Sequence, residues 1–111
     1  MNPGIKKVLN LKKQKVMLAK SKFAIQKQID VVEKKIVLLE KKSIQYKNTI
    51  DHLKNSLLFA GTRSIFVKIK ANKNLEDLHR LYKKKDKLEE KMLRVEAKEF
   101  KINVKISKAI K

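Results

Sequence analysis

The chain has 111 residues, of which 37% are charged and only 5% are aromatic, and its formal net charge is +19. Cysteine is absent, which excludes disulfides and thiolate metal sites, and two glycines and one proline leave few turns for a compact α/β or all-β domain. The charge predicts an anionic partner, which is a nucleic acid, an anionic membrane surface or an acidic protein cavity.

The first predicted element is a long helix over about residues 5–60, a segment without proline or interior glycine. Its apolar residues recur every seven residues in two series, the a and d positions of a heptad repeat. Twelve of the fifteen a and d positions from Val8 to Leu57 are apolar, which predicts a left-handed coiled coil. The d series is Leu11, Leu18, Ile25, Val32, Leu39, Tyr46 and Leu53, and the a series, three residues earlier, is Val8, Lys15, Lys22, Ile29, Ile36, Ser43, Ile50 and Leu57.

The outer side of this helix carries both lysines and apolar residues. Lysine recurs at position f, the most exposed one, from Lys6 to Lys41, while positions b and c are largely apolar from Leu9 to Ile44. A helix that is apolar on several faces is usually buried on several faces. We therefore expect either self-association or insertion into a partner's socket.

The chain reversal is predicted at about residues 60–63. Gly61 is the only interior glycine, and glycine just past a helix end is the common C-cap. Thr62 or Ser64 can then cap a second helix.

The second predicted helix covers about residues 64–110. Eight of its ten seam positions are apolar. The segment Ile65–Asn74 fits the register less well, because Ile65, Phe66 and Ile69 lie off it and Asn72 and Asn74 interrupt it. We expect a register shift or fraying there. The seam positions are Leu78, Lys85, Met92, Glu99 and Ile106, with Leu81, Leu88, Val95, Ile102 and Ala109.

These elements predict an all-α fold, a long two-helix antiparallel coiled-coil hairpin that forms one domain over residues 1–111. A single rod that dimerises satisfies the same heptads, so the sequence leaves the oligomeric state open. A strand at the carboxyl end is a further alternative, because apolar residues alternate with polar ones from Phe100 to Ile106.

The charge is concentrated where the two chain ends would meet. Residues 1–29 have a net charge of +8 and residues 98–111 a net charge of +4, and an antiparallel hairpin places these segments side by side. The predicted open end therefore suits an acidic or anionic environment.

The sequence contains no catalytic constellation. His52 and His79 each stand alone, and there is no glycine-rich phosphate loop. No apolar run approaches the length of a membrane span, and no secretory signal is visible. We expect a cytoplasmic protein that is not an enzyme and has no cofactor, catalytic residue or metal site.

A local motif adds a family resemblance. Arg63, Ser64, Ile65 and Phe66, followed by Lys68, Ile69 and Lys70, resemble the start of the second helix in the central stalk family of type III secretion systems (FliJ in flagella, YscO or SctO in injectisomes).

The resemblance implies a stalk that enters the pore of the hexameric secretion ATPase, promotes its activity and links it to the export gate protein at the cytoplasmic face of the apparatus. It also implies binding to secretion chaperones or a gatekeeper. The residues expected in the ATPase pore are Lys6, Lys7, Lys12, Lys13, Lys15, Met17, Lys20, Phe23, Lys105 and Lys108, and those expected at the gate-facing tip are Phe59, Arg63, Phe66, Ile69 and Lys70.

Two other function classes stay open. One is a sequence-nonspecific nucleic-acid-binding or chaperone-binding scaffold; specific DNA reading is disfavoured because 27 of the 30 basic residues are lysines. The other is a peripheral membrane helix, which the sustained heptads disfavour.

Overall fold

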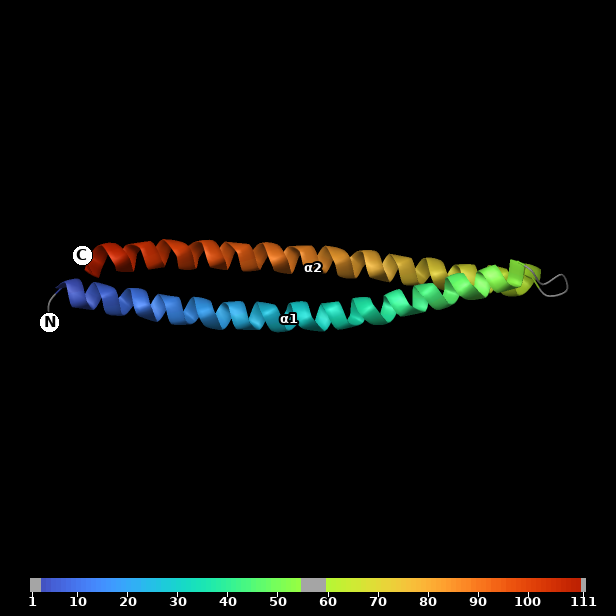
Figure 1. Ribbon diagram of the computed structural model, residues 1–111, viewed down its shortest axis with the longest axis horizontal. Coiled ribbons are helices and arrows are strands. Elements are labelled where there is room, and N and C mark those ends of the chain that lie inside the picture. The colour runs from blue at the N-terminus through green and yellow to red at the C-terminus, as the bar shows by residue number, and fades with distance from the viewer. Residues whose placement is uncertain (1–2, 55–59, 111) are drawn as a thin grey trace. The chain divides into compact units, whose positions relative to one another are not determined.

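A computed structural model describes residues 3–54 and 60–110, and within these ranges every residue is helical (Figure 1). Helix α1 spans Pro3–Lys54 and helix α2 spans Ala60–Ile110. The two helices form the predicted all-α, antiparallel two-helix coiled-coil hairpin, so the fold class is confirmed. The alternative of a strand near the carboxyl end is wrong, because α2 continues as helix to Ile110.

The hairpin divides into two compact units, each containing a segment of both helices. The terminal unit consists of residues 1–30 and 86–111, and the central unit consists of residues 31–85. Within the central unit, Glu33 pairs with Lys85 and Ser43 pairs with Asn74, so residue numbers rise along α1 as they fall along α2. This order defines the antiparallel arrangement.

The core of the terminal unit follows the predicted heptads. Among its buried residues, Leu11 and Ile29 come from α1, and Leu88 and Ile102 come from α2. Every described a or d residue of this unit is at least half-buried except Lys15, whose side chain is exposed. Burying each apolar side chain contributes about 1.5–3 kcal/mol, and a two-stranded coil has no second layer of such contacts.

The central unit has the same construction. Val32 is the most buried core residue at 2% exposure, and Ile36, Leu53 and Leu78 are also buried. The core includes one buried polar residue, Asn74.

The register continues through residues 65–74, where we expected it to shift or fray. Val67 and Ala71 are half-buried and Asn74 is buried at the next seam position, while Ile65 and Phe66 are exposed. Asn74 does not interrupt the seam, because its Nδ2 donates hydrogen bonds to the carbonyl oxygen of Leu39 at 2.8 Å and to Oγ of Ser43 at 2.6 Å. A polar side chain with such partners can occupy a seam position at little cost.

The helix bounds near the reversal also differ from the prediction. Residues 60–63, predicted as the turn, form the first turn of α2, and the described part of α1 is helical to Lys54. Gly61 lies in that first turn, where backbone N–H groups have no intrahelical acceptor, so it does not act as a C-cap. The chain between Lys54 and Ala60 lies outside the described residues, and so does the predicted tip residue Phe59.

Candidate docking surface

Basic side chains gather on one face of α2 in the terminal unit. They recur at steps of three and four residues, the heptad positions c and g, and this spacing places them on one helix face. All of them are exposed. We call this set the terminal stripe: Lys87, Lys91, Arg94, Lys98, Lys101, Lys105 and Lys108.

The same positions of α2 are also mainly basic in the central unit, where Asp77 interrupts them. This central stripe consists of Arg63, Lys70, Lys73, Arg80 and Lys84, all exposed. All three arginines of the chain therefore belong to one stripe or the other.

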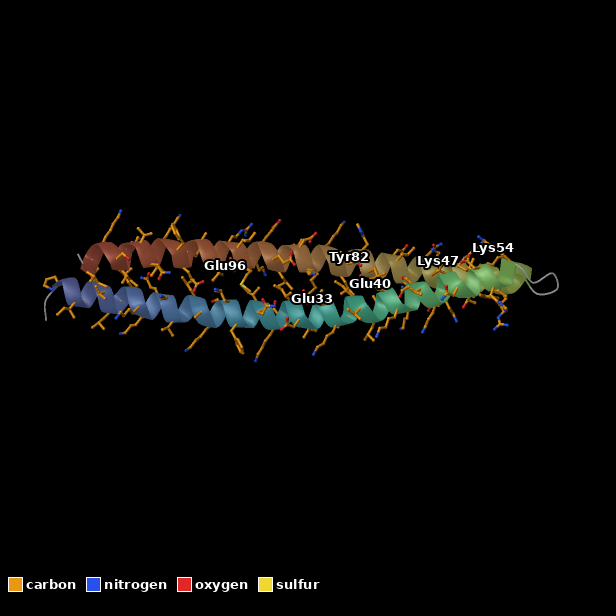
Figure 2. The ribbon with its side chains drawn as sticks, viewed as in Figure 1. Glu33, Glu40, Lys47, Lys54, Tyr82 and Glu96 are labelled. Atoms are coloured by element: carbon orange, nitrogen blue, oxygen red, sulfur yellow. The ribbon has the colours of Figure 1, made fainter. Side chains whose placement is uncertain are left out.

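Four of the acidic side chains lie at heptad position e, which differs from the c and g positions of the stripes. They are Glu33 and Glu40 on α1 and Glu89 and Glu96 on α2. Figure 2 labels Glu33, Glu40 and Glu96 together with Lys47, Lys54 and Tyr82, which lie at the same heptad position. In the central unit these carboxylates are engaged within the hairpin: Glu33 lies 3.3 Å from Lys85, and Glu40 accepts a hydrogen bond from the Tyr82 hydroxyl. That bond, with burial and the Glu40 charge, raises the pKa of Tyr82 above its ordinary value.

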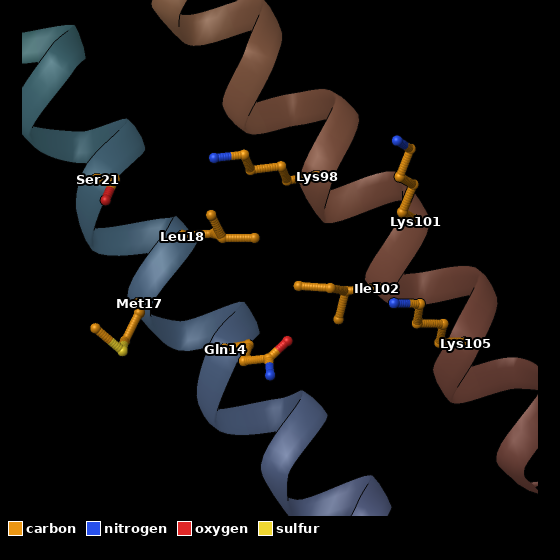
Figure 3. A pocket seen from close by; sticks show the side chains of 8 residues that line it. All are labelled: Gln14, Met17, Leu18, Ser21, Lys98, Lys101, Ile102 and Lys105. Carbon is orange, nitrogen blue, oxygen red and sulfur yellow. The ribbon is translucent and has the colours of Figure 1, made fainter.

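The terminal stripe borders an open groove between α1 and α2 in the terminal unit. Figure 3 shows Leu18 and Ile102 pointing toward one another at its floor, with Lys98 and Lys105 reaching from α2 toward α1. The groove has a volume of about 440 Å³, and none of its lining residues is acidic. They are Gln14, Met17, Leu18, Ser21, Lys98, Lys101, Ile102 and Lys105.

The central unit has a groove at the equivalent heptad positions, with a volume of about 450 Å³. Leu39 and Leu81 replace Leu18 and Ile102, but Asp77 stands where the terminal groove has Lys98. Lys35, Lys42 and Arg80 also line the central groove, and the Asp77 carboxylate, 3.9 Å from Arg80, offsets part of their charge.

Most residues predicted for the ATPase pore are exposed, but they do not share one face. Lys6, Lys7, Lys12, Lys13, Lys15 and Lys20 occupy four different heptad positions of α1. Met17 and Lys105 both line the terminal groove, and Lys108 lies on the terminal stripe. Phe23 is exposed, with Nζ of Lys27 4.5 Å from its ring centroid.

The described residues of the predicted gate-facing tip, Arg63, Phe66, Ile69 and Lys70, are all exposed in the central unit. Sequence analysis missed Lys98 and Lys101. The three- and four-residue spacing of basic residues along the second helix was the signal that could have identified them.

Among the described residues, no group of three or more His, Asp or Glu side chains is placed to bind a metal ion. In the same part of the chain, neither helix has an apolar stretch that could cross a bilayer.

Comparisons with known proteins returned no relative. No family model matches the chain, and no curated protein or solved structure is significantly similar to it.

Proposed function

We propose that this protein is a non-enzymatic central stalk of a type III secretion export apparatus, at its cytoplasmic face. The observation that carries the proposal is the terminal unit, a two-helix coiled coil whose exposed lysines point to several sides. A stalk inside a ring of ATPase subunits is surrounded by the pore wall on all sides. Positive charge distributed around the stalk therefore suits this position better than positive charge on one face. Acidic walls would attract such a shaft, more strongly at low ionic strength.

The coil also suits the mechanical part of this function. Each helix satisfies its backbone hydrogen bonds internally, and its seam side chains pack against the partner helix, so the stalk presents side chains without unfolding. Met17 and Phe23, exposed by 69% and 64%, are the apolar residues available for contact with the pore near its mouth. The exposed tip residues Arg63, Phe66, Ile69 and Lys70 would face the export gate protein.

The test is ATP hydrolysis by the cognate secretion ATPase, titrated with the native chain and with the variant K12E/K13E/K15E/K20E. The control is K34E/K35E/K41E/K42E, which changes the charge equally at four exposed lysines of α1 in the central unit. We expect stimulation by the native chain and the control, and loss in the first variant. Absence of stimulation and of co-elution would refute the stalk. Equal loss in both variants would show that only net charge matters.

Sequence-nonspecific nucleic-acid binding is the second candidate, because all three arginines lie on the basic stripes. It predicts that affinity for duplex DNA falls steeply with salt, with a slope of roughly one per phosphate neutralised. No aromatic residue occupies the c or g positions of the described terminal unit, so base stacking has no platform there.

A further inference from the structure

We infer that the terminal groove binds an acidic amphipathic helix of a partner protein. Its floor is apolar, formed by Leu18 and Ile102 with Met17 at the edge, and a floor of this kind accepts the apolar ridge of a helix. Gln14 and Ser21 are the uncharged polar residues on the α1 side. The groove therefore combines an apolar floor with a rim whose charged residues are all lysines.

The rim determines the charge of the bound helix. Lys98, Lys101 and Lys105 line the groove, and Lys91, Arg94 and Lys108 extend the same face of α2 beyond it. No described c or g position of the terminal unit carries a carboxylate that could neutralise them. Glutamates of a partner helix would meet this row, and charge complementarity would set its association rate and orientation.

The spacing of the lysines fits a helical ligand. Lys98, Lys101 and Lys105 follow steps of three and four, the steps at which a helix presents residues on one face. The apolar stems of the lysines can cover the sides of a docked helix while their ammonium groups remain hydrated. A helix with leucines on one stripe and glutamates beside it would thus satisfy the floor and the rim together.

The floor argues against a nucleic acid as the occupant. Phosphates laid along the groove would face Leu18 and Ile102, and none of the lining residues is aromatic. The central groove has three basic lining residues as well, Lys35, Lys42 and Arg80, but its Asp77 carboxylate would repel an acidic ligand, and the terminal groove has no such residue.

This inference goes beyond the stalk proposal, since it concerns a groove along the side of the terminal unit. The two share Met17, Lys105 and Lys108, so none of these residues enters the test. Lys98 and Lys101 belong only to the groove, and Lys12, Lys13 and Lys20 belong only to the predicted pore contacts, which makes the two failures distinguishable.

The experiment is fluorescence anisotropy of a labelled synthetic peptide helix with leucines on one stripe and glutamates on the flanks, titrated with the full chain. We expect K98E/K101E to weaken binding about tenfold or more, a change of roughly 1.4 kcal/mol. The control K34E/K41E makes the same charge change at exposed f positions of α1 and is expected to weaken binding less than about threefold.

A peptide of the same composition, scrambled so that its leucines no longer share a face, tests the apolar floor. We expect it to bind about tenfold more weakly than the designed peptide, because it cannot fill the groove and face the lysines at once. Circular dichroism of each variant checks that the coil is intact. Equal weakening by both charge variants, equal binding of both peptides, or displacement of the peptide by duplex DNA at lower concentration would overturn the inference.

Discussion

Nζ of Lys22 lies 2.9 Å from Oε1 of Glu99, and both residues occupy seam positions of the terminal unit. In the central unit, Ser43 accepts a hydrogen bond from Asn74, and Lys85 pairs with the flanking Glu33. The polar residues at these seam positions are therefore partnered between the helices. Polar seam residues specify the register and orientation of a coiled coil, since a shifted alignment separates them from their partners.

The Lys22–Glu99 pair predicts a loss of stability at alkaline pH. The hydrogen bond to Glu99, followed by the charge of that carboxylate, raises the pKa of Lys22 above its ordinary value of 10.5, and Glu96 adds a smaller effect. A raised pKa means that the pair contributes fully below pH 10.5 and that this contribution disappears as the pH rises past the folded-state pKa.

Urea unfolding of the native chain and of Glu99→Gln measures this contribution. The difference in unfolding free energy should stay constant through neutral pH and shrink above pH 10.5. Glu96→Gln is the matched control and should show a smaller difference. A Glu99→Gln difference that grows with alkaline pH would contradict the assigned cause.

The buried Asn74 is predicted to fix the register of the central unit. Asn74→Ala removes two hydrogen bonds and should lower the unfolding free energy by about 1–2 kcal/mol. Asn74→Leu keeps the number and branching of the side-chain heavy atoms and makes the seam apolar, so it should leave stability unchanged or raise it while permitting other alignments.

Urea denaturation gives the stability of both variants, and amide NMR spectra report alignment. We expect one set of resonances for the native chain and additional sets for Asn74→Leu. Ser43→Ala serves as the control, because it removes one partner and leaves Asn74 bonded to the Leu39 carbonyl. One set of resonances with native protection in Asn74→Leu would show that apolar packing alone fixes the register.

The fold could be predicted from the sequence because a seven-residue repeat assigns each residue either to the seam between the helices or to the surface. Leu11, Val32 and Leu88 are buried where the heptads placed them. The register near Asn74 was mispredicted, since a sequence does not reveal whether a polar seam residue has a partner on the other helix. The start of α2 at Ala60 was missed because Gly61 fits a first helical turn as well as a C-cap.

The candidate site was less predictable. The charge count by segment predicted that Lys105 lies in the same part of the hairpin as the amino-terminal lysines, and the terminal unit contains both. The count gave no information on which side of the coil each lysine occupies. The seam register of α2 must be known before Lys98 and Lys101 can be placed on the same face as Lys105. The alignment of α1 against α2 must also be known before Leu18 can be placed in the same groove. Contacts of this kind depend on the pairing of two distant segments.

Tyr82 gives a spectroscopic prediction for the central unit. The hydrogen bond from its hydroxyl to Glu40, with burial and the Glu40 charge, raises its pKa above 10.0. In a Tyr46→Phe background, where Tyr82 is the remaining tyrosine, alkaline titration of tyrosinate absorbance should give a midpoint above 10.0. Adding Glu40→Gln should lower that midpoint. Glu33→Gln, one heptad away from Glu40, should leave the midpoint closer to its starting value. A midpoint that Glu40→Gln does not change would show that the hydrogen bond to Glu40 does not cause the raised pKa of Tyr82.

Two leucines of α2 provide a matched test of which side of the helix is packed. Leu88 is 4% exposed and Leu93 is 64% exposed, although they lie in the same unit and on the same helix. Leu88→Ala should lower the unfolding free energy by about 2–5 kcal/mol, because it removes buried methyl groups and leaves a cavity. Leu93→Ala should change it by less than about 0.5 kcal/mol for an isolated chain.

Chemical denaturation over a range of protein concentrations separates packing within the chain from packing between copies. If the native chain is monomeric, the Leu93→Ala effect remains small at every concentration. If copies associate through the exposed apolar positions of α2, the cost of Leu93→Ala grows with concentration, because stability then includes the association free energy. If Leu88→Ala and Leu93→Ala lowered the unfolding free energy equally at the lowest concentration, the seam assignment of α2 would be contradicted. The two side chains differ mainly in burial within the hairpin.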